Sequence, residues 1–179
     1  MSFSLQQDEQ QLRTSLGSAT PTTDGIYPAR IIEVIEVGLV PGFSSEDEPY
    51  EQIGITFQLQ HGKQVCKLMK MSSYSTSTLM SITHACLKDD NSEITEVKHL
   101  LNATIDLEIL ADPRFPKIVG YSHPSDGLST EDAPAAFEDP TYYDMNDTDN
   151  NMTKRPGILR GIHQPIRSAI SQRIRVRED

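Results

Sequence analysis

Apolar and polar side chains alternate along the segment from Glu51 to Ser72, and this alternation predicts a β-hairpin. In the first half every second residue is large and apolar, which is the period of a half-buried strand. His61 and Gly62 follow, with glycine in the second place, where a two-residue turn needs a positive φ. The chain then returns as a second strand from Val65 to Met71. The apolar residues of the first strand are Ile53, Ile55, Phe57 and Leu59.

A two-residue turn would place Phe57 opposite Cys66 and Thr56 opposite Lys67. The hairpin then has an apolar face directed to the core, made of Ile55, Phe57, Leu59, Cys66 and Leu68. The other face is polar and cationic, and it consists of Gly54, Thr56, Gln58, Val65, Lys67 and Met69. This second face is a candidate binding surface, while lysines on an edge strand also serve solubility alone. Both interpretations stay open at this point.

The segments around the hairpin predict three more strands and one or two short helices. A long strand begins at Gly25, and Glu33 interrupts its apolar face, which indicates a bend or bulge. Tyr27, Ala29, Ile31, Ile35 and Val37 are expected on one side of it. Leu79, Ile82 and Cys86 recur at helical spacing after a Ser/Thr-rich stretch that offers N-caps, so a helix is expected near 77–88. A shorter helix ends at Asn102, and strands follow at 103–110 and 117–121. In the first of these Ile105, Leu107 and Ile109 should point inward, and Thr104, Asp106 and Glu108 outward.

This order of elements predicts a mainly β protein with a five-stranded, OB-fold-like barrel. One or two short helices lie between strands 3 and 4, as in that fold, and OB-folds commonly hold single-stranded nucleic acid or oligosaccharide. The strand pattern alone is also compatible with a small sandwich. We expect a flexible arm over 1–24, the core over 25–124, an acidic linker over 125–153 and a basic amphipathic segment over 154–179.

Charge is unevenly distributed along the 179 residues, whose net charge is −10. Residues 1–120 carry 9 basic and 16 acidic side chains, whereas 121–153 carry 8 acidic and no Lys or Arg. Residues 154–179 carry 7 basic and 2 acidic side chains. Such segregation is typical of tails that interact with a partner. The acidic tract also contains aromatic residues, so a plain disordered linker and a docking segment that competes for the hairpin are both compatible with it.

The basic C-terminal segment has an isoleucine at every fourth position from Ile158 to Ile174. Pro165 suits the first turn of a helix that would run to about Val176. A basic amphipathic helix can bind protein, nucleic acid or membrane. The acidic tract and acidic body are the nearest opposite charges, so docking on protein is favoured over a membrane role. The expected partner-binding residues are Ile166, Arg167, Ile170, Arg173 and Ile174.

No catalytic or metal-binding motif is present in the sequence. Cys66 and Cys86 are expected to be buried free thiols, and the five histidines are scattered. There is no Walker loop, G-x-S-x-G or H-E-x-x-H. We therefore expect no enzyme activity, cofactor or metal. A membrane span or signal peptide is also absent, and the sequence predicts a soluble, cytoplasmic protein.

Four stretches resemble a family of small phage-encoded proteins associated with replication or recombination gene clusters. They are GIYPARIIEVIEVGLVPG, the hairpin ending in KLMKMS, HLLNATIDLEIL and KIVGYSHP, within Gly25 to Pro124. The family includes OB-fold single-stranded-DNA-binding proteins. The resemblance implies that this chain binds single-stranded DNA in the cytoplasm of a host cell.

A channel for single-stranded DNA needs cations along the phosphates and flat side chains on which bases stack. The candidate nucleic-acid-binding residues are Arg30, Thr56, Lys63, Lys67, Lys70 and Tyr74. Aromatic residues make up only 6% of the chain, so cooperative or homo-oligomeric binding would be needed for useful occupancy. The alternative from a different class is a structural or assembly protein, such as a virion component, whose arms grip neighbouring subunits.

Overall fold

One long strand, β1 (Gly25–Val40), organises the sheet because three other strands pair with it. β2 (Tyr50–Leu59) runs antiparallel along most of its length. On the other edge, β4 (Thr104–Leu110) pairs with the first part of β1, and β6 (Thr141–Asp144) pairs in parallel with the later part. The computed structural model describes residues 21, 23–87, 96–112, 116–126, 131–146 and 164–173.

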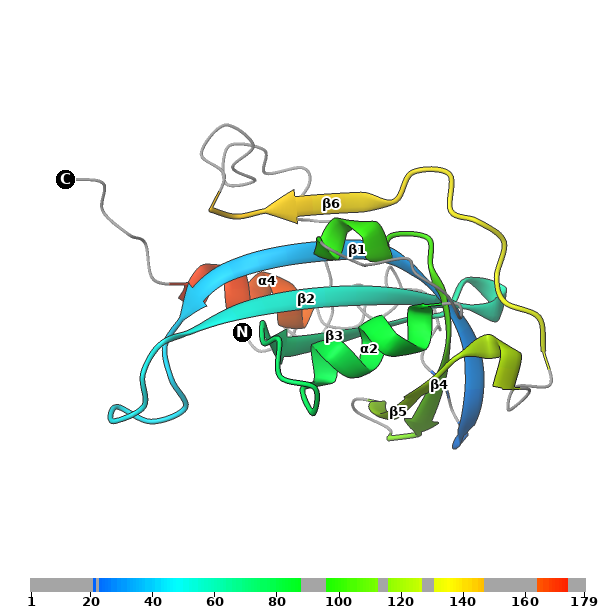
Figure 1. Cartoon of the computed structure of the whole chain (residues 1–179), viewed down its shortest axis with the longest axis horizontal. Coiled ribbons are helices and arrows are strands. Elements are labelled where there is room, and N and C mark those ends of the chain that lie inside the picture. The colour runs from blue at the N-terminus through cyan, green and yellow to red at the C-terminus, as the bar shows by residue number, and fades with distance from the viewer. Residues whose placement is uncertain are drawn as a thin grey trace, which may run out of the picture.

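The sheet order is β3-β2-β1-β4-β5, with β6 beside β1 (Figure 1). β3 spans Gln64–Lys70 and β5 spans Lys117–Ser122. The helices are α2 (Thr78–Cys86), α4 (Gln164–Gln172) and the 3-10 turns η1 (Gln60–Gly62), η2 (Val97–Leu100) and η3 (Pro124–Asp126). The mainly β class and the helical segment between the third and fourth strands are confirmed. The expected barrel is not closed: among the described pairings β3 and β5 do not meet, and α2 packs against both strands.

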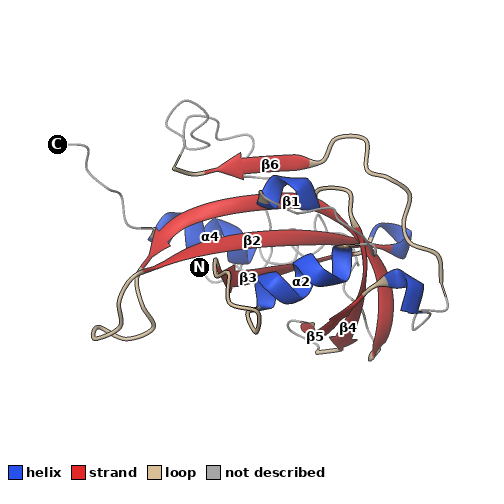
Figure 2. Cartoon of the chain, viewed as in Figure 1, coloured by secondary structure: helices blue, strands red, loops and turns tan. Residues whose placement is uncertain are grey.

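An inner cluster of apolar side chains fills the side of the sheet that α2 covers (Figure 2). Ser77 caps α2 by accepting a hydrogen bond from the Met80 backbone N–H at 3.2 Å, so the helix begins where the Ser/Thr-rich stretch predicted. Asp106 is an exception to the expected pattern of β4, because it is only 1% exposed rather than directed to solvent. The cluster includes Ala29, Ile31, Val34, Ile53, Ile55, Phe57, Leu59, Val65, Met69, Ile82, Leu100, Ile105, Leu107 and Ile109.

A second, outer cluster lies on the opposite side of the sheet, beneath α4. β1 supplies both clusters because its pairing with β2 shifts twice, between Ile31 and Glu33 and between Glu36 and Gly38. The predicted bulge is thus confirmed, but Ile35 and Val37 belong to the outer cluster rather than sharing a face with Ile31, since each shift turns the following side chains to the other side. The outer cluster consists of Ile35, Val37, Val40, Met145, Ile166, Ala169 and Ile170.

The predicted register of the hairpin is wrong by one residue. Phe57 pairs with Val65, and Thr56 pairs with Cys66 rather than Lys67. The connection has three residues instead of two: the Leu59 N–H donates to the Lys63 oxygen at 2.7 Å across Gln60–Gly62. His61 as well as Gly62 has a positive φ, of 62° and 72°. An odd loop length moves every residue of the returning strand to the other face.

Segments beyond Pro124 also pack on the sheet. β6 comes from the acidic tract, and α4 from the basic C-terminal segment. Within the tract over 125–153, for which a plain linker and a docking segment were both open, Thr141–Asp144 pairs with β1 past the point where β4 leaves it. The predicted N-terminal arm lies almost entirely outside the described residues, as do residues 174–176 of the expected helix.

Candidate nucleic-acid interface

The candidate interface is the outer face of the β1–β2–β3 sheet, on which residues from the three strands form rows. From one end to the other these rows are Arg30–Gln58–Gln64, Glu33–Thr56–Cys66, Ile35–Gly54–Leu68 and the pair Gln52–Lys70. Gln52 and Gln58 are six positions apart on β2, which corresponds to about 20 Å of strand. Among the predicted binding residues, Arg30, Thr56 and Lys70 belong to this face. Lys63 and Lys67 do not. Lys63 lies at the hairpin turn, where its backbone oxygen accepts from Leu59, and Lys67 pairs with Ile55 on the inner side of β3.

The middle of the outer face is closed to solvent. Thr56 is 1% exposed, and its Oγ1 donates to Glu33 Oε1 at 2.8 Å. Burial raises the pKa of the Glu33 carboxyl, and the Thr56 hydrogen bond partly offsets that rise. Thr56 was predicted on an open binding surface, and this is wrong: its face of β2 is the expected one, but that face is covered, and the paired Cys66 packs against the outer cluster to which α4 contributes.

The helix α4 covers this face with the residues that were predicted to bind a partner. Ile166 is 0% exposed and Ile170 is 6% exposed, both within the outer cluster. The Arg173 guanidinium donates to the backbone oxygen of Met145, which follows β6. In the structure α4 therefore packs on the sheet of its own chain, and binding of these residues to a separate partner stays a prediction. Arg167 is half-buried on α4, and Ile174 lies outside the described residues.

At one end of the outer face Arg30 is engaged by backbone oxygens. Its Nε donates to the Pro134 oxygen at 2.8 Å, and its Nη1 donates to the Asn102 oxygen at 2.5 Å. Asn102 in turn bonds the backbone of Phe137 through both atoms of its side-chain amide. Arg30 therefore fastens residues 134–137 to the start of β4, which is a structural role.

At the other end, aromatic rings and a lysine gather in the open. Phe43 stacks on Tyr50, with ring centroids 5.7 Å apart and an interplanar angle of 24°. Lys70 Nζ lies 5.7 Å from the centroid of the Tyr50 ring, within the range of a cation–π contact. Phe43 is 94% exposed, and Tyr74, four residues beyond Lys70, is 81% exposed. We call Phe43, Tyr50 and Lys70, which contact one another, the aromatic end of the sheet.

Lys70 lies in a stretch of sequence without acidic residues, whereas Phe43 and Tyr50 are flanked by Glu46, Asp47, Glu48 and Glu51. The 37 residues from Gln52 to Lys88, which supply β3, α2 and most of β2, contain four lysines and no Asp or Glu. The rest of the sequence carries 12 basic and 26 acidic side chains. The loop over Pro41–Pro49 nevertheless brings acids close, and Asp47 Oδ2 accepts the Ser44 N–H at 2.9 Å and shapes that loop.

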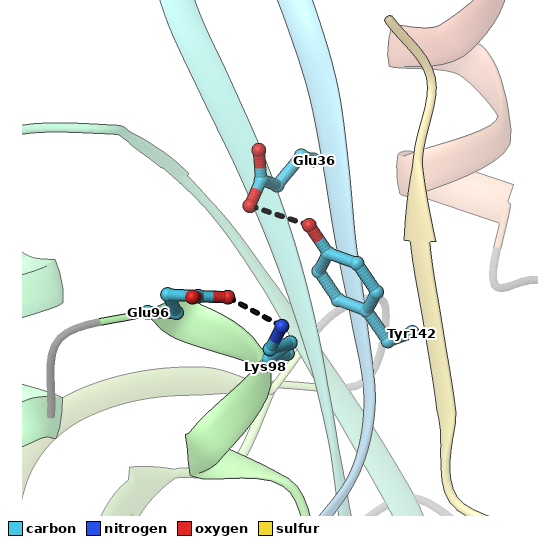
Figure 3. A network of polar contacts seen from close by, with 4 residues as sticks. All are labelled: Glu36, Glu96, Lys98 and Tyr142. Atoms are coloured by element: carbon cyan, nitrogen blue, oxygen red, sulfur yellow. Dashed lines mark hydrogen bonds and ion pairs between the residues drawn. The ribbon is translucent and has the colours of Figure 1, made fainter. Parts of the chain in front are cut away.

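The edge of β1 that β6 occupies is acidic and is held by a hydrogen bond (Figure 3). Tyr142 donates from its hydroxyl to Glu36 Oε1 at 2.9 Å, and Lys98 pairs with Glu96 at 2.6 Å nearby. Burial raises the pKa of the Glu36 carboxyl. The hydrogen bond from Tyr142 lowers this pKa in part, and the negative charges of Asp144, Glu51 and Glu96 raise it further. The Tyr142 pKa is also raised, chiefly by burial and then by its bond to Glu36. A polyanion would be repelled from this edge.

Two features of the aromatic end were missed in the sequence. Tyr50 was not counted as a stacking residue, although it directly follows the proline-closed loop that carries Phe43. The acid-free run from Gln52 to Lys88 was hidden because charges were summed over residues 1–120. Charges counted in a short window moved along the sequence reveal this acid-free run.

Within the described parts of the chain, no group of three or more His, Cys, Asp or Glu side chains could hold a metal ion. Cys66 and Cys86 are free thiols, and burial raises their pKa values to about 11 and about 12. No described helix is both long and apolar enough to cross a membrane. No protein-family model matches the chain, and no curated protein matches it.

Proposed function

We propose that this chain is a non-enzymatic single-stranded-DNA-binding protein, acting in replication or recombination like the phage proteins that Gly25–Pro124 resembles. The observation that carries the proposal is the aromatic end of the sheet: a stacked pair, Phe43 and Tyr50, with Lys70 against one ring. Bases stack on aromatic faces while lysines attract phosphates, and this combination binds single strands without reading their sequence.

The topology supports the same function. The strand order β3-β2-β1-β4-β5, with α2 between β3 and β4 in the sequence, is compatible with the connectivity of an OB-fold, although the sheet is open and has a sixth strand. OB-folds bind oligonucleotides on the face of strands 2 and 3 and with the loops after strands 1 and 4. The loop after β1 is Pro41–Pro49, which carries Phe43. If the sheet functions as an OB-fold, this loop belongs to the ligand site, which supports the proposal.

The expected affinity of one site is modest. Each stacked base contributes about 1–3 kcal/mol, and the aromatic end offers two rings, of which Phe43 is largely exposed. The acidic remainder of the chain opposes DNA at long range, an effect that salt screens beyond about 10 Å at 0.1 M. Several copies on one strand would therefore be needed for high occupancy.

A second candidate, a structural or assembly protein, is favoured by the cover that α4 forms over the outer face. A chain that fills its own ligand face with Ile166 and Ile170 could use the sheet as a scaffold only. The two functions differ in whether the chain binds an oligonucleotide at all.

Fluorescence anisotropy of a labelled oligo-dT at two salt concentrations tests the proposal. We expect saturable binding that weakens with salt, with a logarithmic slope of about −0.7 for each phosphate contact. Lys70→Glu should weaken binding and make the slope shallower by about one contact. Lys117→Glu is the matched control, since Lys117 is an exposed lysine at the start of β5, away from the aromatic end in Figure 1.

Absence of binding at low salt would exclude the DNA-binding function and leave the assembly function. Equal affinities for Lys70→Glu and Lys117→Glu would instead show that binding occurs away from the aromatic end.

A further inference from the structure

The helix α4 packs against a glycine, Gly54, in the middle of the buried strand β2. A Cβ atom added at Gly54 would lie 2.8 Å from Cδ1 and Cγ1 of Ile166, and 3.2 Å from its Cγ2. Glycine weakens a strand interior and often marks a place where another group approaches closely. Any side chain at position 54 would push Ile166 outward. Gly54 is therefore the site into which α4 fits.

The helix lies across the path that leads from the aromatic end onto the sheet. The row Ile35–Gly54–Leu68 is next to the pair Gln52–Lys70, and Tyr50 and Leu68 both pack against the outer cluster to which α4 contributes. With α4 in place, a single-stranded DNA held by Tyr50 and Lys70 has no access to the outer face of β2 and β3. Without α4, that face would offer apolar side chains for bases next to a lysine.

We propose that α4 is a built-in competitor for DNA: the helix and a single strand exclude each other on the outer face between Lys70 and Gly54. The proposal rests on the proposed function, because it assigns the covered face to the same ligand. The bound DNA is expected to stop before the row Glu33–Thr56–Cys66, since the Glu33 carboxyl lies there beside Thr56. Docked α4 lowers the apparent affinity by the fraction of molecules in which the face is open.

The test uses the full chain and the two cysteines. Cys66 packs beneath α4 against the outer cluster, whereas Cys86 packs against the inner cluster. In a Cys86→Ser background, the rate at which a thiol reagent modifies Cys66 reports release of the helix. Two variants release it by different routes, Ile166→Gln with Ile170→Gln on the helix and Gly54→Ala in its seat. Ser171→Gln, at an exposed position of α4, is the matched control.

We expect both release variants to speed Cys66 modification. The Ile166→Gln, Ile170→Gln variant should also bind oligo-dT at least about tenfold more tightly, as for a helix docked in nine molecules of ten. The control should change neither quantity. Faster modification with unchanged affinity would overturn the competition while leaving the DNA-binding function standing.

Two other outcomes also count against the proposal. If neither release variant speeds the modification of Cys66, then α4 does not shield this face in solution. If the original chain and the released variant both fail to bind oligo-dT at low salt, the proposed function fails and the competition fails with it.

Discussion

The inner and outer clusters flank the same three strands, yet they are closed by segments at very different distances along the chain. The buried residues of the inner cluster all lie between Ala29 and Ile118, including those of α2, and the later strand β6 adds only the partly buried Tyr142 among the described residues. The outer cluster joins β1 to Met145 and to α4, more than 100 residues later. A cover that comes from far along the chain can leave while the rest of the fold stays intact, because it closes no other part of the sheet.

The two faces also differ in chemistry. The inner face is almost wholly aliphatic around Phe57. The outer face places a glycine, the Thr56–Glu33 hydrogen bond and the Cys66 thiol under the helix. Small and polar groups beneath a removable helix are typical of a covered binding surface more than of a core. The inner face is therefore the core on which folding depends, and the outer face is the candidate site.

The largest loss of stability is expected from a substitution in the inner cluster. Phe57 is fully buried, and Phe57→Ala should lower the free energy of unfolding by about 3–5 kcal/mol. Thermal or urea unfolding measures the loss. Phe43→Ala makes the same change at a side chain that is 94% exposed and should shift stability by no more than about 0.5 kcal/mol. Similar losses for the two variants would contradict the assignment of Phe57 to the core.

A smaller and local effect is expected on the outer side. Ile166→Ala removes buried apolar atoms, but its cost is at most the roughly 2–5 kcal/mol of a core Ile→Ala change, because α4 can detach. Thiol modification at neutral pH distinguishes the clusters: Cys66 should react faster, and Cys86 should stay as protected as before. Equal acceleration at both cysteines would mean that the clusters unfold together.

The smallest effect concerns pH. The folded-state pKa of Glu33 is raised by burial, so its protonated form favours folding. Its contribution to stability is fully present below the ordinary carboxyl pKa and is lost as pH rises through the raised value. Glu33→Gln keeps a hydrogen-bond acceptor for Thr56 without the charge. The variant should melt close to the original chain at acidic pH and above it at neutral pH, and a constant difference across pH would exclude this cause.

The sequence predicts the elements of this fold better than it predicts their contacts. Period-two alternation located β2, β3 and β4, and the Ser/Thr-rich stretch before α2 indicated where that helix starts, because these signals are local. The hairpin register was lost at His61, a non-glycine residue with a positive φ that lengthens the turn by one. One side chain in the left-handed region is enough to exchange the faces of β3.

The candidate site was predicted only in part for a related reason. Isoleucines at every fourth position show that α4 has an apolar face, but not which surface receives it. That surface exists because bulges in β1 turn Ile35 and Val37 outward and because Gly54 leaves room for Ile166. Lys70 was proposed from its residue type, whereas Tyr50 becomes a candidate for stacking with bases only through its contacts with Phe43 and Lys70.

Hydrogen–deuterium exchange of the full chain, with and without oligo-dT at low salt, tests the central claim most directly. With DNA, we expect slower exchange in the loop over Pro41–Pro49 and in residues 71–76, and faster exchange in Ile166–Gln172. The exchange rates of the amides where β1 pairs with β4 should not change. An exchange pattern unaffected by the oligonucleotide, or one in which α4 becomes more protected along with the aromatic end, would contradict the account.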